Sequence, residues 1–190
     1  LKKALSLLNQ AGWEMKEGHL RHKDTGKSFV FEMLLYSPED QKIALAFQKT
    51  LKKIGIIMNI RLCDAAQYEN RRMSYDYDMI VHMWAHTLSP GSEQAFYWGS
   101  KGTDEPGSRN YVGIKDPAID ELCAILANAK DRHTLISAAK ALDRVLLWGH
   151  FMIPLYHTNK IRLAYWNKFG YPNIDPRVGI NFSTWWYEKR

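Results

Sequence analysis

Apolar residues recur along this chain with two alternating periods, every third or fourth residue in some stretches and every second residue in others. The first period is typical of amphipathic helices and the second of half-buried strands. Glycine, proline and capping residues separate the stretches and set their ends. The pattern predicts helices ending at Gly12, over 38–54, over 65–73, from Pro117, and over 132–148, a hairpin before a strand over 28–36, and strands over 56–62, 77–84, 151–157 and 160–166.

The order strand, helix, strand, helix, strand between residues 28 and 84 determines the expected fold class. Such an order requires at least partly parallel pairing with right-handed crossovers. Four caps support the helices: Ser37 precedes Pro38, Asp64 opens a capping box, Asp116 precedes Pro117, and Asp131 begins the last helix. We therefore expect an α/β fold with a mixed sheet flanked by helices.

Composition and charge narrow the class of protein. With 190 residues, 46% apolar and 24% charged, the chain is long enough for one large or two small globular domains. Its longest apolar runs fall short of the roughly 18 residues of a membrane-spanning helix. The net charge of +6 is scattered over predicted helix faces, as in a solvated surface. The helical pattern starts at Leu1 without a cap or an initiating Met, so we expect a fragment of a longer protein.

The stretch from Tyr75 to Tyr111 is the candidate binding surface. It begins as a strand and continues as a long connection rich in aromatic residues, Gly, Ser and Pro. Alternation along the strand places His82, Trp84 and His86 on one face. The competing interpretation is that these aromatic residues cover the core beneath the loop. The predicted ligand-binding residues are Trp84, His86, Tyr97, Trp98, Arg109, Asn110 and Tyr111.

Motifs for other chemistry are absent. His82 and His86 lack an HExxH context, and neither Cys63 nor Cys123 has zinc-ligand spacing, so no metal site is predicted. Cys123 lies on an apolar helix face and is expected to be a buried, inert thiol. No GxSxG, GxGxxG or P-loop sequence occurs, and no basic stripe indicates nucleic acid. We expect a non-enzymatic protein that needs no cofactor and binds no nucleic acid. The alternative that stays open is a periplasmic hydrolase of peptides or glycans.

Four strings in this order resemble a known family: LLNQAGW, GKSFVFEMLL, the YDYDM strand leading into Trp84, and RNYVGIKDPAIDEL. They are similar to the C-terminal half of family 5 extracellular solute-binding proteins, the oligopeptide and dipeptide receptors of ABC importers. The strings WAHTLSPGSEQAFYWGS, PGSRNYVGI, ALDRVLLWGHFMIPLYH and AYWNKFG resemble the YejA-type branch, which is associated with peptide and microcin C uptake. The resemblance covers nearly the whole chain.

The resemblance implies the C-terminal lobe of a two-lobed, type II-like periplasmic binding protein. Residues 1–168 would form this ligand-binding lobe, and residues 169–190 would return toward the missing N-terminal lobe. The implied ligand is a peptide and the implied partner is an ABC permease in the inner membrane. A signal peptide would lie upstream, in keeping with a periplasmic location. In peptide-binding relatives an Asp soon after the matching Trp holds the ligand's amino terminus, whereas here no acid occurs between Trp84 and Glu93.

Overall fold

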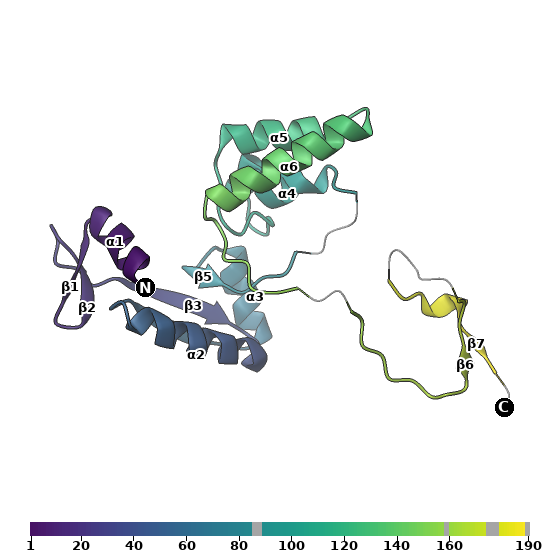
Figure 1. Ribbon diagram of the computed structural model, residues 1–190, viewed down its shortest axis with the longest axis horizontal. Coiled ribbons are helices and arrows are strands. Elements are labelled where there is room, and N and C mark those ends of the chain that lie inside the picture. The colour runs from purple at the N-terminus through teal and green to yellow at the C-terminus, as the bar shows by residue number, and fades with distance from the viewer. Residues whose placement is uncertain (85–88, 158–159, 174–178, 189–190) are drawn as a thin grey trace. The chain divides into compact units, whose positions relative to one another are not determined.

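The computed structural model describes residues 1–84, 89–157, 160–173 and 179–188 (Figure 1). The chain forms two compact units, Leu1–Phe151 and Met152–Arg190, and each is considered by itself. In the described part of the chain, no helix has both the length and the apolar character needed to cross a bilayer.

The chain begins with helix α1 (Lys2–Gln10) and a hairpin of β1 (Trp13–Lys16) and β2 (His19–His22). These two strands pair antiparallel from Trp13–His22 to Lys16–His19, as the sequence predicted. The amide of Leu20 donates a hydrogen bond of 2.8 Å to the carbonyl of Gly55. A Cβ at Gly55 would lie 2.5 Å from the Leu20 nitrogen, and its φ is +76°, so the crossing of these two segments requires glycine.

Three parallel strands form the central sheet, in the order β4-β3-β5. β3 (Val30–Leu35) lies between β4 (Ile57–Leu62) and the short β5 (Met79–Ile80). This arrangement confirms the expected parallel pairing, and Leu34 and Leu35 at its centre are almost fully buried.

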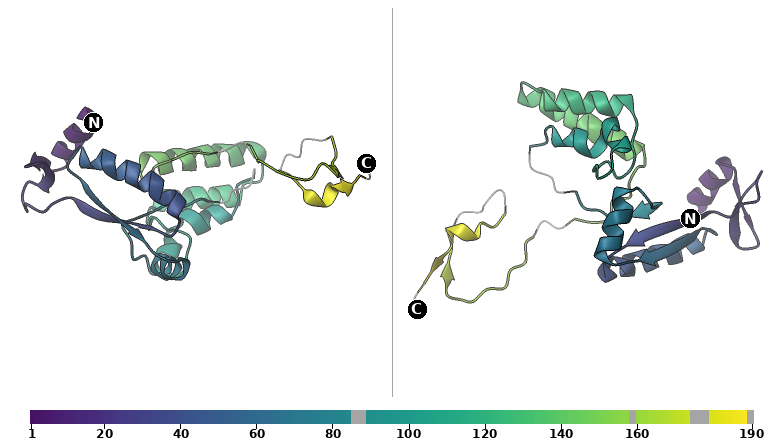
Figure 2. Two further views of the ribbon diagram at one scale, coloured as in Figure 1. Left: turned by 90° about the horizontal axis from the view of Figure 1, so that it is seen from below. Right: turned by 180° about the vertical axis from the view of Figure 1, so that it is seen from behind.

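Helices α2 (Pro38–Lys52) and α3 (Ala65–Met73) connect the three strands. The Ser37 hydroxyl accepts from the Asp40 amide and the Asp64 carboxylate from the Gln67 amide, so both predicted caps are confirmed. α2 lies along the sheet, as Figure 2 shows, and its Ala44 packs with buried Met33, Leu35 and Met58. The side-chain amide of Gln48 also donates to the Met58 carbonyl at 2.7 Å.

The predicted strand over 77–84 is wrong in length, because only Met79 and Ile80 pair with β3. The ladder ends early on one side because the Asp78 carboxylate accepts from the Glu32 amide at 2.8 Å. On the other side β3 ends at Leu35, where the chain turns to begin α2 after Ser37. Residues after Ile80 therefore have little strand left to pair with.

The second half of the first unit is helical. Helix α5 (Pro117–Ala127) begins at its Asp116 cap and α6 (Arg132–Trp148) at its Asp131 cap, as predicted. The two helices lie side by side (Figures 1 and 2). Their contact buries Ile119, Cys123 and Leu126 of α5 and Ala138, Leu142 and Leu146 of α6.

The long connection before α5 was expected to be irregular, and this expectation is wrong in part. It contains helix α4 (Glu93–Trp98) and the 3₁₀ turn η1 (Ser100–Asp104). A helix of six residues contains too few apolar repeats for its period to be recognised in a sequence. The Glu93 carboxylate accepts from the Gly91 amide at 2.9 Å, and α4 packs against α5.

The second unit contains the two-stranded antiparallel pair β6 (Phe169–Gly170) and β7 (Trp186–Tyr187), with the 3₁₀ turn η2 (Phe182–Thr184). Three aromatic rings surround Trp185, with centroid distances of 4.9 Å to Tyr165 and 5.2 Å to both Tyr171 and Phe182. These ring contacts hold the unit together, although Tyr171 and Phe182 are each more than half exposed.

The strands predicted over 151–157 and 160–166 are wrong. These residues have no regular secondary structure, and the turn residues 158–159 lie outside the described part of the chain. Pro154 lacks an amide donor, and Ile153, Leu155 and Tyr156 are 58%, 55% and 81% exposed. An apolar alternating pattern forms a strand only where a partner strand accepts its hydrogen bonds.

Candidate ligand-binding site

The candidate site begins where β5 ends. Residues 81–84 continue from β5 without regular secondary structure, with side chains on alternating sides. His82 and Trp84 are half-buried, whereas Met83 between them is 85% exposed. The predicted placement of His82 and Trp84 on one face is confirmed. His86, which was expected on the same face, lies outside the described residues.

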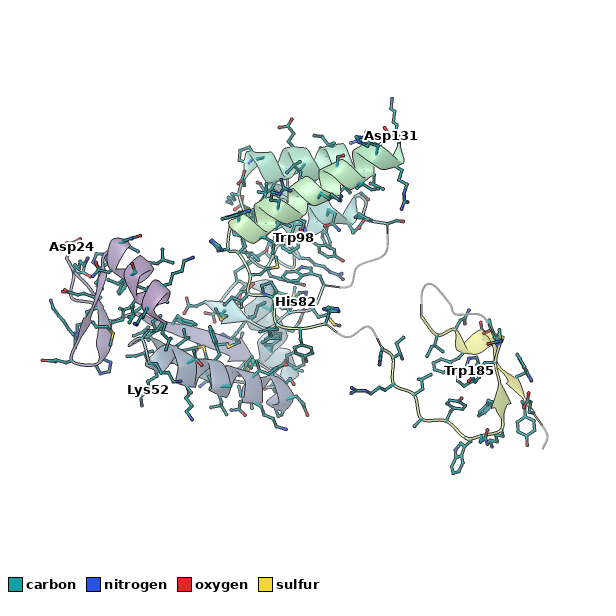
Figure 3. All side chains as sticks on the ribbon, in the orientation of Figure 1. Asp24, Lys52, His82, Trp98, Asp131 and Trp185 are labelled. Atoms are coloured by element: carbon teal, nitrogen blue, oxygen red, sulfur yellow. The ribbon has the colours of Figure 1, made fainter. Side chains whose placement is uncertain are left out.

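Four rings form an aromatic column: Trp98, Trp84, His82 and Tyr111. Successive ring centroids are 4.9 Å, 4.8 Å and 4.5 Å apart. The column joins the end of β5 to α4 and to the loop before α5; in Figure 3 its members His82 and Trp98 are labelled, and they lie where the sheet meets the helices. Stacked and edge-to-face rings at these distances attract one another beyond the area they bury.

Arg72 of α3 extends the column. Its guanidinium carbon lies 4.5 Å from the centroid of the Tyr111 ring. The same guanidinium forms an ion pair with Glu69 one turn earlier, so its charge is largely compensated. This pairing raises the pKa of Arg72 above its usual value.

The two aromatic residues of α4 are core residues. Tyr97 is 7% exposed and Trp98 is 4% exposed. The indole N–H of Trp98 donates to the buried Gln94 amide oxygen at 3.1 Å, so its polar group is satisfied within the lobe. Tyr97 and Trp98 therefore shape the site from below, by supporting Trp84.

Asn110 is completely buried and connects three parts of the loop. Its amide donates to the carbonyls of Gly99 and Ile114, each at 3.0 Å, and its carbonyl accepts from the Ile114 amide at 3.1 Å. Its backbone amide also donates to the Ser108 hydroxyl at 3.1 Å. These bonds give Asn110 a structural role, as the residue that fixes the position of Arg109 and Tyr111.

Two tyrosines attach the start of β5 to the same loop. The hydroxyl of Tyr77 donates to the Tyr111 carbonyl at 2.9 Å, and that of Tyr75 to the Gly102 carbonyl at 3.3 Å. Burial raises the pKa of Tyr77. Tyr111 is thus held in the column by a hydrogen bond from the start of β5 as well as by ring contacts.

Trp84 differs from Trp98 in its polar group. Its indole nitrogen is shielded from solvent and has no hydrogen-bond acceptor among the residues that the structure describes. A shielded N–H without an acceptor is rare and costs free energy, so it requires an explanation. An acceptor from a bound ligand would satisfy it.

His82 is a titratable residue within the column. Burial lowers its pKa below the usual value of 6.5, and the positive charges of Arg72 and Arg109 lower it further. The neutral imidazole can accept one hydrogen bond and donate another.

Of the predicted site residues, the structure brings Trp84, Trp98 and Tyr111 into one column and places Tyr97 and Asn110 behind it. Arg109 is exposed beside it, with its guanidinium carbon 5.6 Å from the centroid of the Phe96 ring. Their role as ligand contacts stays a prediction. The prediction omitted His82 and Arg72. The two-residue spacing of His82 from Trp84 was a usable signal, whereas α3 carries no sequence signal that points to Arg72.

The described residues provide no cluster of three His, Cys, Asp or Glu side chains that could hold a metal ion. Cys123 is 1% exposed, as predicted, and burial raises its pKa to about 11, so its thiol is unreactive at neutral pH. The site as described is suited to contact and hydrogen bonding.

Comparison with known proteins is consistent with that geometry. The sequence pattern of the bacterial extracellular solute-binding proteins, family 5 (Middle), matches residues 1–106, more than half of the chain. The chain belongs to this family. Its family 5 relatives include an uncharacterized protein, y4wM, of Sinorhizobium fredii, which is 45% identical over all of this chain.

Two family 5 relatives from Agrobacterium fabrum have names that describe a ligand. The probable peptide-binding protein YejA is 39% identical over all of this chain, and the peptidoglycan-binding protein YepA is 38% identical over 98% of it. The chain spans 28–31% of the length of these relatives. The similarity to YejA agrees with the branch that the sequence indicated.

A solved structure shows the same fold. The oligopeptide-binding protein AppA of Bacillus subtilis, in complex with a nonapeptide, aligns with a TM-score of 0.72 at 22% identity. The alignment covers 99% of this chain and 37% of AppA. The expected α/β fold of a family 5 binding-protein lobe is thereby confirmed.

Proposed function

We propose that the protein to which this chain belongs is the peptide-binding component of an ABC import system. It captures a peptide in a cleft between two lobes, in the periplasm, and delivers it to a membrane permease. Residues 1–168 contribute the C-terminal lobe, and residues 169–190 return toward the N-terminal lobe. Membership of family 5 and the 39% identity to a probable peptide-binding protein support this proposal.

One observation in the structure supports the proposal most directly: Trp84, which follows the parallel strand β5, has a shielded indole N–H with no acceptor among the described residues. In open α/β sheets ligands gather at the carboxyl ends of strands, where loops rather than helices face the solvent. Peptides carry a carbonyl acceptor in every residue. A donor aimed at the backbone is indifferent to side-chain identity, which suits a receptor for varied peptides.

The column beneath Trp84 provides rigidity. Trp98 and Tyr97 are locked in the core, and His82 and Tyr111 hold the other side of the ring. A binding surface that is already ordered loses little conformational entropy when a ligand arrives. The aromatic area of Trp84 then offers apolar contact to variable side chains.

Recovery of the natural ligand tests the proposal. The full-length protein is purified without denaturation, and mass spectrometry identifies what it carries. The expected result is a mixture of intact peptides, which lose their affinity when Trp84 is changed to Ala. Recovery of cleaved products, or turnover of a peptide library, would instead support the periplasmic hydrolase.

The identity to YepA makes peptidoglycan peptides a second ligand source to test. Calorimetry of the full-length protein with linear peptides and with peptides released from peptidoglycan distinguishes the two sources. We expect the isolated chain of 190 residues to bind either ligand weakly, because one wall of the cleft is absent. Tight binding by the isolated chain would contradict the two-lobed mode of capture.

A further inference from the structure

Arg109 projects from one of the most constrained segments of the first unit. It lies between Ser108, which is 8% exposed, and Asn110, which is fully buried. Four hydrogen bonds made by Asn110 fix the backbone on its C-terminal side. The η1 turn packs closely on this segment, because a Cβ at Gly102 would lie 2.4 Å from the Ser108 hydroxyl oxygen.

The side chain of Arg109 is exposed, unlike its neighbours, and rests on a ring. Its guanidinium carbon is 5.6 Å from the centroid of Phe96, which is itself 51% exposed. Stacking on an aromatic face restricts the guanidinium plane without using its five N–H donors. A cation held in this way is preorganised for a planar acceptor such as a carboxylate.

The charge of Arg109 is uncompensated within the described residues. The other arginines near the site have acidic partners: Arg71 pairs with Glu32 and Asp76, and Arg72 pairs with Glu69. Arg109 belongs to none of the ion pairs formed between described residues. Its guanidinium is therefore available to an external anion.

The charge of Arg109 also acts on His82 of the aromatic column. Arg109 and Arg72 are the two charged groups that lower the pKa of His82. Of these two charges, that of Arg72 is paired with Glu69, so Arg109 supplies the uncompensated positive charge, and no acidic residue occurs between Trp84 and Glu93. A ligand amine placed here would meet repulsion, whereas a ligand carboxylate would meet attraction.

We propose that Arg109, stacked on Phe96, binds a carboxylate of the peptide ligand beside the aromatic column. The inference rests on the proposed peptide-binding function and specifies the ligand's charge. The carboxylate has two sources, the carboxyl terminus of the peptide or an acidic side chain. A charge-assisted hydrogen bond of this kind corresponds to an affinity difference of about tenfold or more.

A competition experiment with the full-length protein tests the inference. A randomised pentapeptide pool is prepared with free carboxyl termini and again as carboxyl-terminal amides, and the two are mixed in equal amounts. Protein-bound peptides are separated by gel filtration and counted by mass spectrometry. The wild-type protein is expected to enrich the free-carboxylate form about tenfold, or to enrich Asp and Glu among the amides if the side chain is the source.

The variant Arg109→Gln should lose this enrichment while it still binds amides that lack acidic residues. Arg144→Gln, which changes an exposed arginine on α6, is the matched control and should retain it. Thermal unfolding of both variants should match the wild type, since neither side chain is buried.

Three results overturn the inference in different ways. Equal recovery of all carboxylate and amide forms by the wild type excludes a carboxylate preference. Retained enrichment in Arg109→Gln excludes Arg109 as its source. Recovery of no peptide by the wild type refutes the proposed function itself, and with it the inference.

Discussion

The indole rings of Trp84 and Trp98 lie with their centroids 4.9 Å apart and their planes at 40°. Trp98 belongs to α4, is 4% exposed and donates its N–H to Gln94. Trp84 follows β5, is half-buried and has an N–H without an acceptor among the described residues. The contact thus joins a core residue whose N–H is hydrogen-bonded to a half-buried residue whose N–H is not. We therefore expect substitutions of Trp98 to affect mainly stability, and substitutions of Trp84 to affect mainly ligand binding.

Replacing Trp98 with Ala should reduce stability strongly. Removing a buried indole creates a cavity beneath the column, and such changes lower the free energy of unfolding by about 3–5 kcal/mol. Urea unfolding of the full-length protein measures the difference. Trp148→Ala is the control, because this side chain is 76% exposed and its loss should cost well under half as much. Equal losses would show that Trp98 is not a core residue.

Trp84→Phe should weaken ligand binding and leave stability nearly unchanged. The change keeps an aromatic ring in the column and removes the N–H donor, which has no acceptor among the described residues, together with part of the half-buried ring. Loss of one hydrogen bond of about 0.5–1.5 kcal/mol predicts an affinity about two- to tenfold lower. Calorimetry with a recovered ligand gives the affinity, and urea unfolding gives the stability. A marked loss of stability with unchanged affinity would contradict a ligand role for this N–H.

Asn110→Ala should destabilise the loop between η1 and α5. The substitution leaves the Gly99 carbonyl and the Ile114 amide and carbonyl without their side-chain partners in a buried setting. Each buried backbone group left without a partner costs about 1–3 kcal/mol. We therefore expect urea unfolding to show a free energy of unfolding lower by at least about 2 kcal/mol. Asn128→Ala, which removes an exposed amide that donates to Ala124, should cost far less. An equal loss of unfolding free energy in both variants would show that the hydrogen bonds of Asn110 stabilise the protein no more than the exposed one of Asn128.

His82 should make the stability depend on pH. Its pKa is lowered in the folded protein by burial and then by two arginines, so the unfolded chain binds the proton more tightly. Stability is therefore fully present above the unfolded pKa of 6.5 and is lost as the pH falls below it. Urea unfolding at pH 7.5 and pH 5 should show a smaller acid-induced loss for His82→Gln than for the wild type.

The exposed His133 provides the control for this prediction. His133→Gln should retain the acid-induced loss of the wild type. A His82→Gln variant with the same pH dependence as the wild type would show that this imidazole is not desolvated. Comparing the variants at both pH values removes the contribution of all other titrating groups that they share.

Local signals predicted most of the elements. Ser37, Asp64, Asp116 and Asp131 were each recognised as caps, and all four accept a backbone hydrogen bond at a helix start. A cap is a contact between residues two or three positions apart, so a short window of sequence contains all of its information. The parallel order of the sheet followed from the alternation of strands and helices for the same reason.

The missed elements depended on partners far along the chain. Met79 and Ile80 form a strand and Trp84 does not, because β3 offers a ladder only up to Leu35. Residues 151–157 have a strand-like pattern, and no strand among the described residues pairs with them. An apolar alternation shows that a segment can pair, and its neighbours decide whether it does.

For the candidate site, the sequence by itself determined the family, the position of the aromatic stretch after the third strand and the shared face of His82 and Trp84. Only the tertiary structure decided that Trp98 and Asn110 face the core, that Arg72 reaches Tyr111, and that Arg109 has no ion-pair partner among the described residues. Residue type and spacing follow from neighbours along the backbone, whereas burial and charge compensation arise when distant segments exclude water together.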